Sequence, residues 1–158
     1  MKYYLYTFLC LCIFSCQKEK PITNIELLKK YVILPTKPET VQYEVIEKKL
    51  REGSQDCSKL ISVIGILKFS NKDFKRILED IQMKKENEYE MNLATDNGLY
   101  KNWYPPNVKK LFSEERKKSP KTIIYTGNFF NKENIIGGKT VCFITDNNEI
   151  VINVGYCN

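Results

Sequence analysis

Apolar and polar residues alternate over several short stretches of this chain, a pattern that is typical of β-strands. In residues 41–46, Val41, Tyr43 and Val45 fall on one side of the predicted strand, and the other side is mostly polar. Residues 59–69 are apolar on both sides, which predicts a central strand that is covered on both faces. Further strands are predicted over residues 89–94, 122–130, 140–145 and 150–156.

The last two predicted strands are expected to form a hairpin. Asn147-Asn148 is a residue pair that favours a tight turn. A two-residue loop at this position would place Cys142 opposite Asn153. The apolar residues that we expect on one face of this hairpin are Val141, Phe143, Ile150, Ile152, Val154 and Tyr156.

Helical start signals and a helical apolar period occur at three places. Thr23 with Glu26 makes a capping box, and Ser70 with Asp73 makes a second one ahead of an apolar stripe. Pro105-Pro106 is typical of a helix start. The apolar positions of the three predicted helices are Ile25, Leu28 and Val32; Phe74, Ile77, Leu78 and Ile81; and Val108, Leu111 and Phe112.

The order of these elements indicates the fold class. Helices and strands follow one another irregularly, and short turns join neighbouring strands, which favours an antiparallel sheet. We therefore predict an α+β domain: an antiparallel sheet of about five to six strands, with two to three helices packed on one side. Because no internal repeat is present, residues 22–158 are predicted to form a single domain.

An apolar run of twelve residues, Tyr3–Phe14, lies near the N-terminus and follows Lys2. As a helix it would cover about 18 Å, whereas the hydrocarbon core of a bilayer is about 30 Å thick. A positive start, a short apolar region and a small residue at its end are typical of a secretory signal. Residues 1–15 are therefore predicted to be a signal peptide.

Cys16 comes directly after this run, in the sequence Ile13-Phe14-Ser15-Cys16. An ordinary signal-peptidase cut after Ser15 would place the large Ile13 at position −3, where a small residue is needed. The four residues instead resemble the lipobox of bacterial lipoproteins, which has a branched aliphatic residue at −3, a small residue at −1 and cysteine at +1. The alternative interpretation is an unmodified signal-peptide cysteine.

The resemblance implies that Cys16 carries fatty acyl chains such as palmitate and anchors the protein in a lipid bilayer. Each buried methylene group contributes ~0.8 kcal/mol, and two or three chains anchor a protein stably. Residues 16–21 would then be the lipidated cysteine and its tether. Gln17-Lys18-Glu19-Lys20 is similar to the short Lys/Glu tags of lipoproteins on the outer face of the outer membrane. The expected location is the cell envelope, on the periplasmic or the surface face of the outer membrane.

The chain is basic, with a net charge of +6 that becomes +5 without residues 1–15, which hold one basic and no acidic residue. A positive surface favours anionic headgroups, surface polysaccharide or an acidic protein. Among the 25 basic residues only Arg51, Arg76 and Arg116 are arginines, and the lysines are interleaved with glutamates. Since arginine is the residue that binds phosphate and guanine with paired hydrogen bonds, the composition fits nucleic acid poorly, and no nucleic-acid partner is predicted.

Three cysteines follow Cys16, namely Cys57, Cys142 and Cys157. An exported protein meets an oxidising compartment, so one disulfide and one remaining thiol are expected. In the predicted hairpin, Cys157 lies ~13 Å beyond the residue opposite Cys142, which is too far for a bridge. We predict a Cys57–Cys157 disulfide, because both cysteines would lie at strand ends. Three free buried thiols are the alternative.

The sequence contains no recognisable catalytic motif, and no cofactor or metal site is predicted. It has no histidine, which removes the commonest general base, the commonest zinc ligand and the histidine-activated nucleophiles. Gly138-Lys139-Thr140 matches the end of a phosphate-binding loop, but a strand is predicted to follow it, so we interpret it as a hairpin turn. Carboxylate pairs such as Glu79/Asp80 and Glu88/Glu90 remain for acid–base chemistry.

The most unusual stretch is residues 99–106, Leu-Tyr-Lys-Asn-Trp-Tyr-Pro-Pro, which holds the only tryptophan. Tyr100, Trp103 and Tyr104 stand beside prolines that stiffen the backbone. Aromatic residues on a rigid loop are favoured anchors for a protein partner or for the face of a sugar. The alternative is an aromatic plug that closes one end of the core.

Two functions from different classes follow. The first is an envelope lipoprotein, anchored through Cys16, whose small non-catalytic domain binds a protein or glycan partner, for instance as an inhibitor or immunity protein. The second is a hydrolase that acts on a cell-surface polymer through two carboxylates ~5 to 9.5 Å apart. A purely structural lipoprotein cannot be distinguished from the first by sequence.

Overall fold

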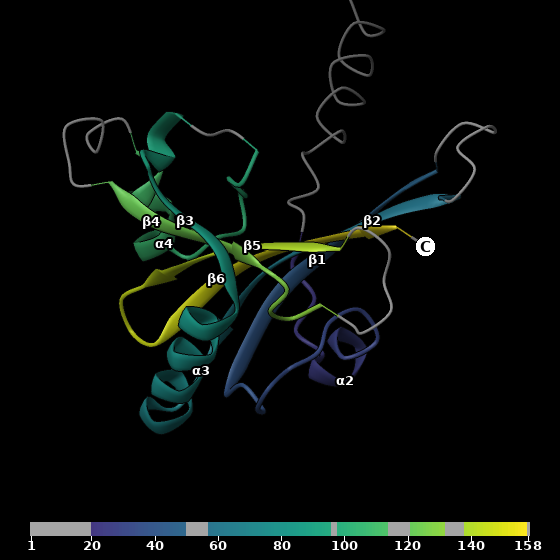
Figure 1. Cartoon of the computed structure of the whole chain (residues 1–158). Coiled ribbons are helices and arrows are strands. Elements are labelled where there is room, and N and C mark those ends of the chain that lie inside the picture. Colours follow the sequence, from purple (N-terminus) through teal and green to yellow (C-terminus); the bar gives the residue numbers. More distant parts are fainter. Residues whose placement is uncertain (1–19, 50–56, 96–97, 114–120, 132–137, 158) are drawn as a thin grey trace, which may run out of the picture.

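The structure, a computed structural model, describes residues 20–49, 57–95, 98–113, 121–131 and 138–157. Within these ranges, six antiparallel strands form one sheet in the order β1-β2-β6-β5-β4-β3, and three helices accompany it (Figure 1). The predicted α+β class is confirmed. The strands are β1 (Thr40–Lys49), β2 (Lys59–Lys68), β3 (Lys85–Met91), β4 (Thr122–Gly127), β5 (Lys139–Thr145) and β6 (Glu149–Cys157). The helices are α2 (Ile25–Leu28), α3 (Asn71–Lys84) and α4 (Pro106–Leu111), with a short 3₁₀ turn η1 (Leu93–Thr95).

β2 lies between β1 and β6 and is covered on both faces, as its sequence predicts. Val63 and Leu67, which are fully buried, belong to a core that also contains residues of α2 and α3. Ile64 and Ile66 point to the other face and belong to a second core with α4. The sheet therefore separates two apolar layers. We call the side of α2 and α3 the first face and the side of α4 the second face.

The helices consequently occupy both sides of the sheet. The prediction that they pack on one side holds for α2 and α3, whose Leu28, Ile77 and Ile81 share one core. α4 lies on the second face, where Val108 is fully buried. The reason is that β2 has a second apolar face, which needs a cover of its own.

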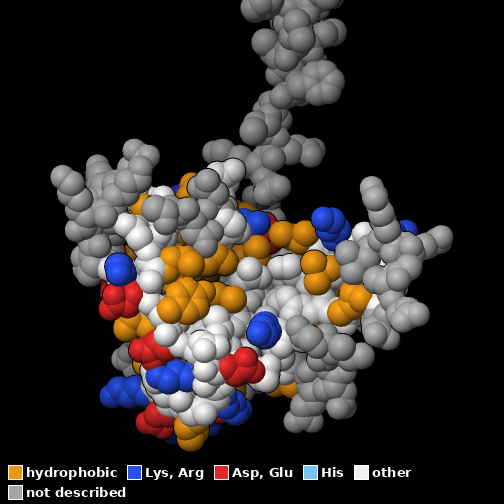
Figure 2. Space-filling model, turned by 45° about the horizontal axis from the view of Figure 1, so that its top comes forward, with side chains coloured by type: hydrophobic (Ala, Val, Ile, Leu, Met, Phe, Trp, Pro, Cys, Tyr) orange, Lys and Arg blue, Asp and Glu red, His pale blue; other side chains and the backbone are white. Residues whose placement is uncertain are grey.

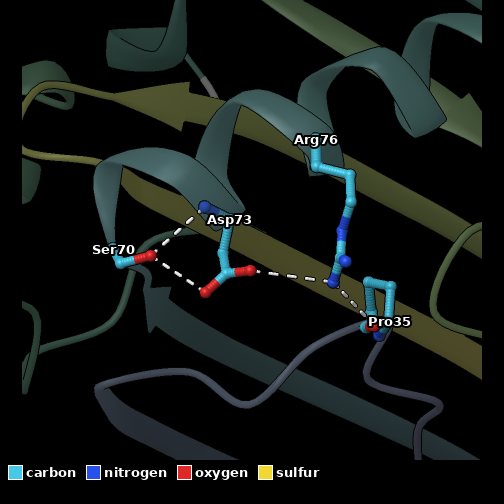
Figure 3. A network of polar contacts seen from close by, with 4 residues as sticks. All are labelled: Pro35, Ser70, Asp73 and Arg76. Carbon is cyan, nitrogen blue, oxygen red and sulfur yellow. Dashed lines mark hydrogen bonds and ion pairs between the residues drawn. The ribbon is translucent and has the colours of Figure 1, made fainter.

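α3 starts at the predicted cap. Ser70 Oγ accepts a hydrogen bond from the Asp73 backbone amide (3.2 Å) and donates one to Asp73 Oδ2 (2.9 Å). Asp73 Oδ1 lies 3.7 Å from Arg76 Nη2, which donates to the Pro35 carbonyl at 3.4 Å (Figure 3). Because Pro35 belongs to the loop after α2, this network ties the two helical segments of the first face together.

α2 is a single turn, and its N-cap is Asn24 instead of the predicted Thr23. Asn24 Oδ1 accepts a hydrogen bond from the Leu27 amide at 3.0 Å. The box at Thr23 does not form because Ile22 makes an antiparallel bridge with Tyr43 of β1, which keeps the chain extended up to this point. A long-range strand contact therefore moves the start of the helix by one residue.

The β5–β6 hairpin differs from its prediction by one residue. Cys142 pairs with Ile152 instead of Asn153, because the loop consists of three residues, Asp146–Asn148. Asn147 and Asn148 in this loop have φ values of 70° and 59°, which asparagine tolerates well. A shift of one residue turns a strand over. Val141 and Phe143 therefore face away from Ile152, and the predicted single-face set is wrong for these two residues.

Cys57 and Cys157 form the predicted disulfide, with their Cα atoms 5.5 Å apart and a sequence separation of 100. It ties the end of β6 to the residues that lead into β2. Cys142 is a free thiol, fully buried in the first-face core, and burial raises its pKa to about 12. A thiol with such a high pKa is a poor nucleophile, which fits a packing role.

Gly127, at the end of β4, provides a test of the packing between β4 and α3. A Cβ at this position would lie 2.6 Å from the Lys84 carbonyl oxygen and 2.8 Å from Phe129 Cε1. Gly127→Ala is therefore expected to destabilise the fold by about 1–3 kcal/mol, since overpacking forces the backbone to move. Gly155→Ala is the matched control, because its Cβ would meet nothing within 4 Å. Equal urea midpoints for the two variants would contradict this packing.

Candidate functional site

The aromatic stretch of residues 99–106 lies across the second face of the sheet, between η1 and α4. Leu99 and Tyr104 are buried there against a core that includes Ile64, Ile66 and Phe143. Figure 2, which brings the top of Figure 1 forward, shows hydrophobic side chains gathered over the middle of the molecule. The stretch thus covers the apolar face that α2 and α3 leave open.

Trp103 is hydrogen-bonded to β1. Its indole Nε1–H donates a hydrogen bond to Glu44 Oε2 at 2.8 Å, and Glu44 Oε1 forms an ion pair with Lys101 Nζ. The side chains of Glu44 and Lys101 are only 20% and 17% exposed. A carboxylate that receives both an indole N–H and an ammonium in a partly buried site holds the loop down on the sheet.

Tyr104 is buried and packs edge-to-face on Trp103, with the ring centroids 4.7 Å apart. Burial, and then the nearby Glu44 charge, raise the pKa of its phenol above the usual range. Within the described part of the chain, its hydroxyl has no hydrogen-bond partner. Tyr100 is 37% exposed and leans on Phe112. Of the three predicted binding residues, Tyr100 is therefore exposed to a partner, Trp103 is partly exposed, and Tyr104 is buried.

A pocket of about 380 Å³ lies at the end of the sheet where β4 begins and β5 ends. It is half open to solvent, and its lining combines an ammonium, a carboxylate, an amide and hydroxyls with apolar side chains. The polar lining is Asn107, Lys121, Thr122, Thr145 and Asp146, and the apolar lining is Leu111, Ile123, Tyr125 and Ile144.

The pocket arises because β4 and β5 separate at this end. Their pairing runs from Gly127↔Thr140 to Ile124↔Phe143. Beyond that point β4 stays with β3, through Met91↔Thr122, and β5 stays with β6, through Thr145↔Glu149. In the described part of the chain, no residues of β4 and β5 pair with each other beyond Ile124↔Phe143. An opening of this kind, lined by hydroxyl, amide and charged side chains, suits an extended peptide or the hydroxyls of a sugar.

The side chains around the point where β4 and β5 separate, which we call the fork, provide charged groups and apolar contact. Lys121 is 59% exposed and lies 3.7 Å from Glu90 of β3, while Ile123 is 42% exposed. Asn107 Nδ2 donates to Glu149 Oε2 at 2.9 Å, which joins α4 to the β5–β6 hairpin beside the pocket. Sequence reasoning missed this site because the fork depends on where two strand pairings stop, and no local pattern marks that point.

The carboxylates considered for a hydrolase lie on α3 and on the edge strand β3. Asp80 pairs with Lys84 of α3 at 2.8 Å, Glu88 pairs with Lys85, and Glu90 lies beside Lys121. Among the residues that the structure describes, no group of three or more Cys, Asp or Glu side chains could hold a metal ion. None of these contacts supports the hydrolase hypothesis.

No family model, curated protein or solved structure matches this chain. Its site has to be interpreted from its own residues. Cys16 lies outside the described residues, so the structure does not bear on its modification. Within the described ranges, no helix has the length and apolar character required to cross a membrane.

Glu44→Ala tests the attachment of the aromatic stretch. It removes the acceptor of the Trp103 indole and leaves the Lys101 ammonium unpaired in a partly buried site, so we expect a loss of about 2–3 kcal/mol in the free energy of unfolding. Glu47→Ala is the control, because Glu47 forms a more exposed ion pair with Lys59 on the same strand. Guanidinium unfolding followed by Trp103 fluorescence measures both variants, and a smaller loss for Glu44→Ala than for Glu47→Ala would refute the attachment.

Proposed function

We propose that this protein is a lipid-anchored lipoprotein of the cell envelope, whose non-catalytic domain binds a partner protein or glycan in the pocket between β4 and β5. The anchor is supported by the lipobox-like sequence that ends in Cys16. The binding role is supported by the pocket, which opens beside Lys121 and Asp146 where the pairing of β4 and β5 stops. The fork between β4 and β5 is the observation that carries the binding part of the proposal.

The chemistry of the pocket favours an extended segment of a protein as its occupant. The hydroxyl, amide and charged side chains of the lining can bond a peptide main chain, and Ile123 and Leu111 offer apolar contact to its side chains. Opposite charges at Lys121 and Asp146 add electrostatic selection, which sets specificity more than affinity. A glycan would use the same hydroxyl and amide groups and could stack on the Tyr125 ring, but it has no side chains for Ile123 and Leu111.

Replacing Cys16 tests the anchor. Cys16→Ala is expected to lose all incorporation of radiolabelled palmitate in the natural host and to leave the membrane fraction, because the acyl chains supply the membrane affinity. Cys12→Ala should keep both, since the large Leu11 precedes that cysteine. Equal labelling of Cys16→Ala and the unaltered protein would disprove the anchor.

Photo-crosslinking tests the pocket in the natural host. A benzoylphenylalanine at Ile123, which lines the pocket, is expected to form a discrete adduct with the partner, and the mass of the adduct tells protein from glycan. The same group at Met83, 78% exposed on α3, is the control and should not form this adduct. Lys121→Ala together with Asp146→Ala should reduce the Ile123 adduct at least about tenfold, if each charge contributes on the order of 1 kcal/mol. Identical adducts from Ile123 and Met83 would refute the assignment of the pocket.

A further inference from the structure

The side chains that β4 contributes to the pocket point to both faces of the sheet. Tyr125 of this strand belongs to the first-face core, and Ile124 belongs to the second-face core. Because successive side chains of a strand alternate between its two faces, Ile123 lies on the first face and Thr122 on the second. The wall of the pocket formed by β4 therefore has an apolar side and a hydroxyl side.

The wall formed by β5 is arranged in the same way. Ile144 packs against the first-face core, whereas Phe143 belongs to the second-face core. Thr145 therefore lies on the second face, because it is two residues away from Phe143. Each of the two strands thus gives the pocket one isoleucine on the first face and one threonine on the second.

The two walls also match each other position by position. The pairing of β4 and β5 stops at Ile124↔Phe143. If the same register continued, residues 123, 122 and 121 would stand opposite residues 144, 145 and 146, but the pocket lies between the two sets. The matched positions are Ile123 with Ile144, Thr122 with Thr145, and Lys121 with Asp146. An occupant of the pocket therefore meets similar groups on both of its flanks and opposite charges where the two strands end.

The first-face side of the pocket favours an apolar group. Tyr125 is almost fully buried in the first-face core, and Ile144 is half-buried against it. Ile123 on the same side is 42% exposed. An apolar side chain that enters here removes the surface of Ile123 from water, which stabilises the complex.

The second-face side of the pocket favours a polar group. Asn107 Nδ2 and Thr145 Oγ1 both donate to Glu149 Oε2, at 2.9 and 3.2 Å. Thr122 adds a second hydroxyl to this side, and Leu111 of α4 adds an apolar side chain. Hydroxyl, amide and carboxylate groups need hydrogen-bond partners when a ligand covers them, so a polar side chain of the ligand fits here.

We propose that the occupant of the pocket is an extended polypeptide segment in which apolar and polar residues alternate. Its apolar side chains lie on the first face, and its polar side chains lie on the second. A chain that runs extended between β4 and β5 points successive side chains to opposite faces of the sheet, as the two strands themselves do. A helix, with its period of 3.6 residues, does not divide its side chains in this way. The inference rests on the proposed binding of a partner in this pocket and adds the residue pattern of that partner.

Mapping of crosslinks to single residues of the partner tests this pattern. Benzoylphenylalanine is placed, in the natural host, at Ile123 or Ile144 on the first face and at Thr122 or Thr145 on the second. We expect the first-face probes to label apolar residues an even number of positions apart, and the second-face probes to label the polar residues between them. If probes on both faces label the same residues, or if the adduct is a glycan or lies within the protein's own chain, the present inference is overturned. Absence of any adduct from all four positions would refute the proposed function as well.

An exchange of two neighbouring residues tests the pattern from the side of the pocket. Thr122→Ile together with Ile123→Thr exchanges the hydroxyl and the apolar group between the two faces and keeps the composition. The Ile144 probe should then give at least about fivefold less partner adduct, since one contact is lost on each face. Ile46→Glu together with Glu47→Ile on β1 is the matched control, because Ile46 is 43% exposed and does not line the pocket.

The control exchange on β1 should leave the Ile144 adduct unchanged. Near-UV circular dichroism verifies that both exchanged variants are folded. An undiminished adduct after the exchange on β4 would overturn the alternating pattern while the pocket remained a binding site.

Discussion

Burial of β2 on both of its faces is the constraint on which the rest of the structure depends. A strand with Val63 and Leu67 on one side and Ile64 and Ile66 on the other loses stability if either side remains in water. Two different segments of the chain cover the two faces. α2 and α3 pack on the first face, and the irregular segment from η1 to α4 packs on the second. The aromatic stretch is therefore placed by the need to cover the second face of β2, and not by exposure to a partner.

Trp103 has a polar partner on the sheet, whereas the buried hydroxyl of Tyr104 has none within the described residues. Trp103 needs an acceptor for its indole N–H, and Glu44 supplies one from a β1 position that faces the same layer. The same carboxylate holds Lys101, so one residue of a largely polar strand face fixes the loop at two points. Both faces of the central strand β2 are thus covered by segments of the same chain.

Features set by local pattern could be predicted from the sequence, and features set by distant contacts could not. The doubly apolar pattern of β2, the Ser70 cap of α3 and the Cys57–Cys157 disulfide follow from nearby residues or from strand ends. The face of Cys142 was predicted wrongly because a loop of two or three residues fits Asn147-Asn148 equally well, and one residue reverses every side chain of a strand. The N-cap of α2 at Asn24 depends on the bridge between Ile22 and Tyr43 of β1, a contact between distant parts of the sequence. The fork between β4 and β5 depends on three strand pairings at once, so no local pattern marks the pocket.

The two ends of the sheet differ in what they can contact. At one end the Cys57–Cys157 disulfide joins β6 to the residues that lead into β2. At the other end the pairing of β4 and β5 stops, and a pocket opens beside Lys121 and Asp146. The free edge of β3 is closed to other strands by its glutamates, since charged side chains discourage edge-to-edge pairing. The disulfide holds its end of the sheet together through a covalent bond, whereas at the opposite end the pairing of β4 and β5 stops at Ile124↔Phe143, and the pocket follows from this difference between the two ends.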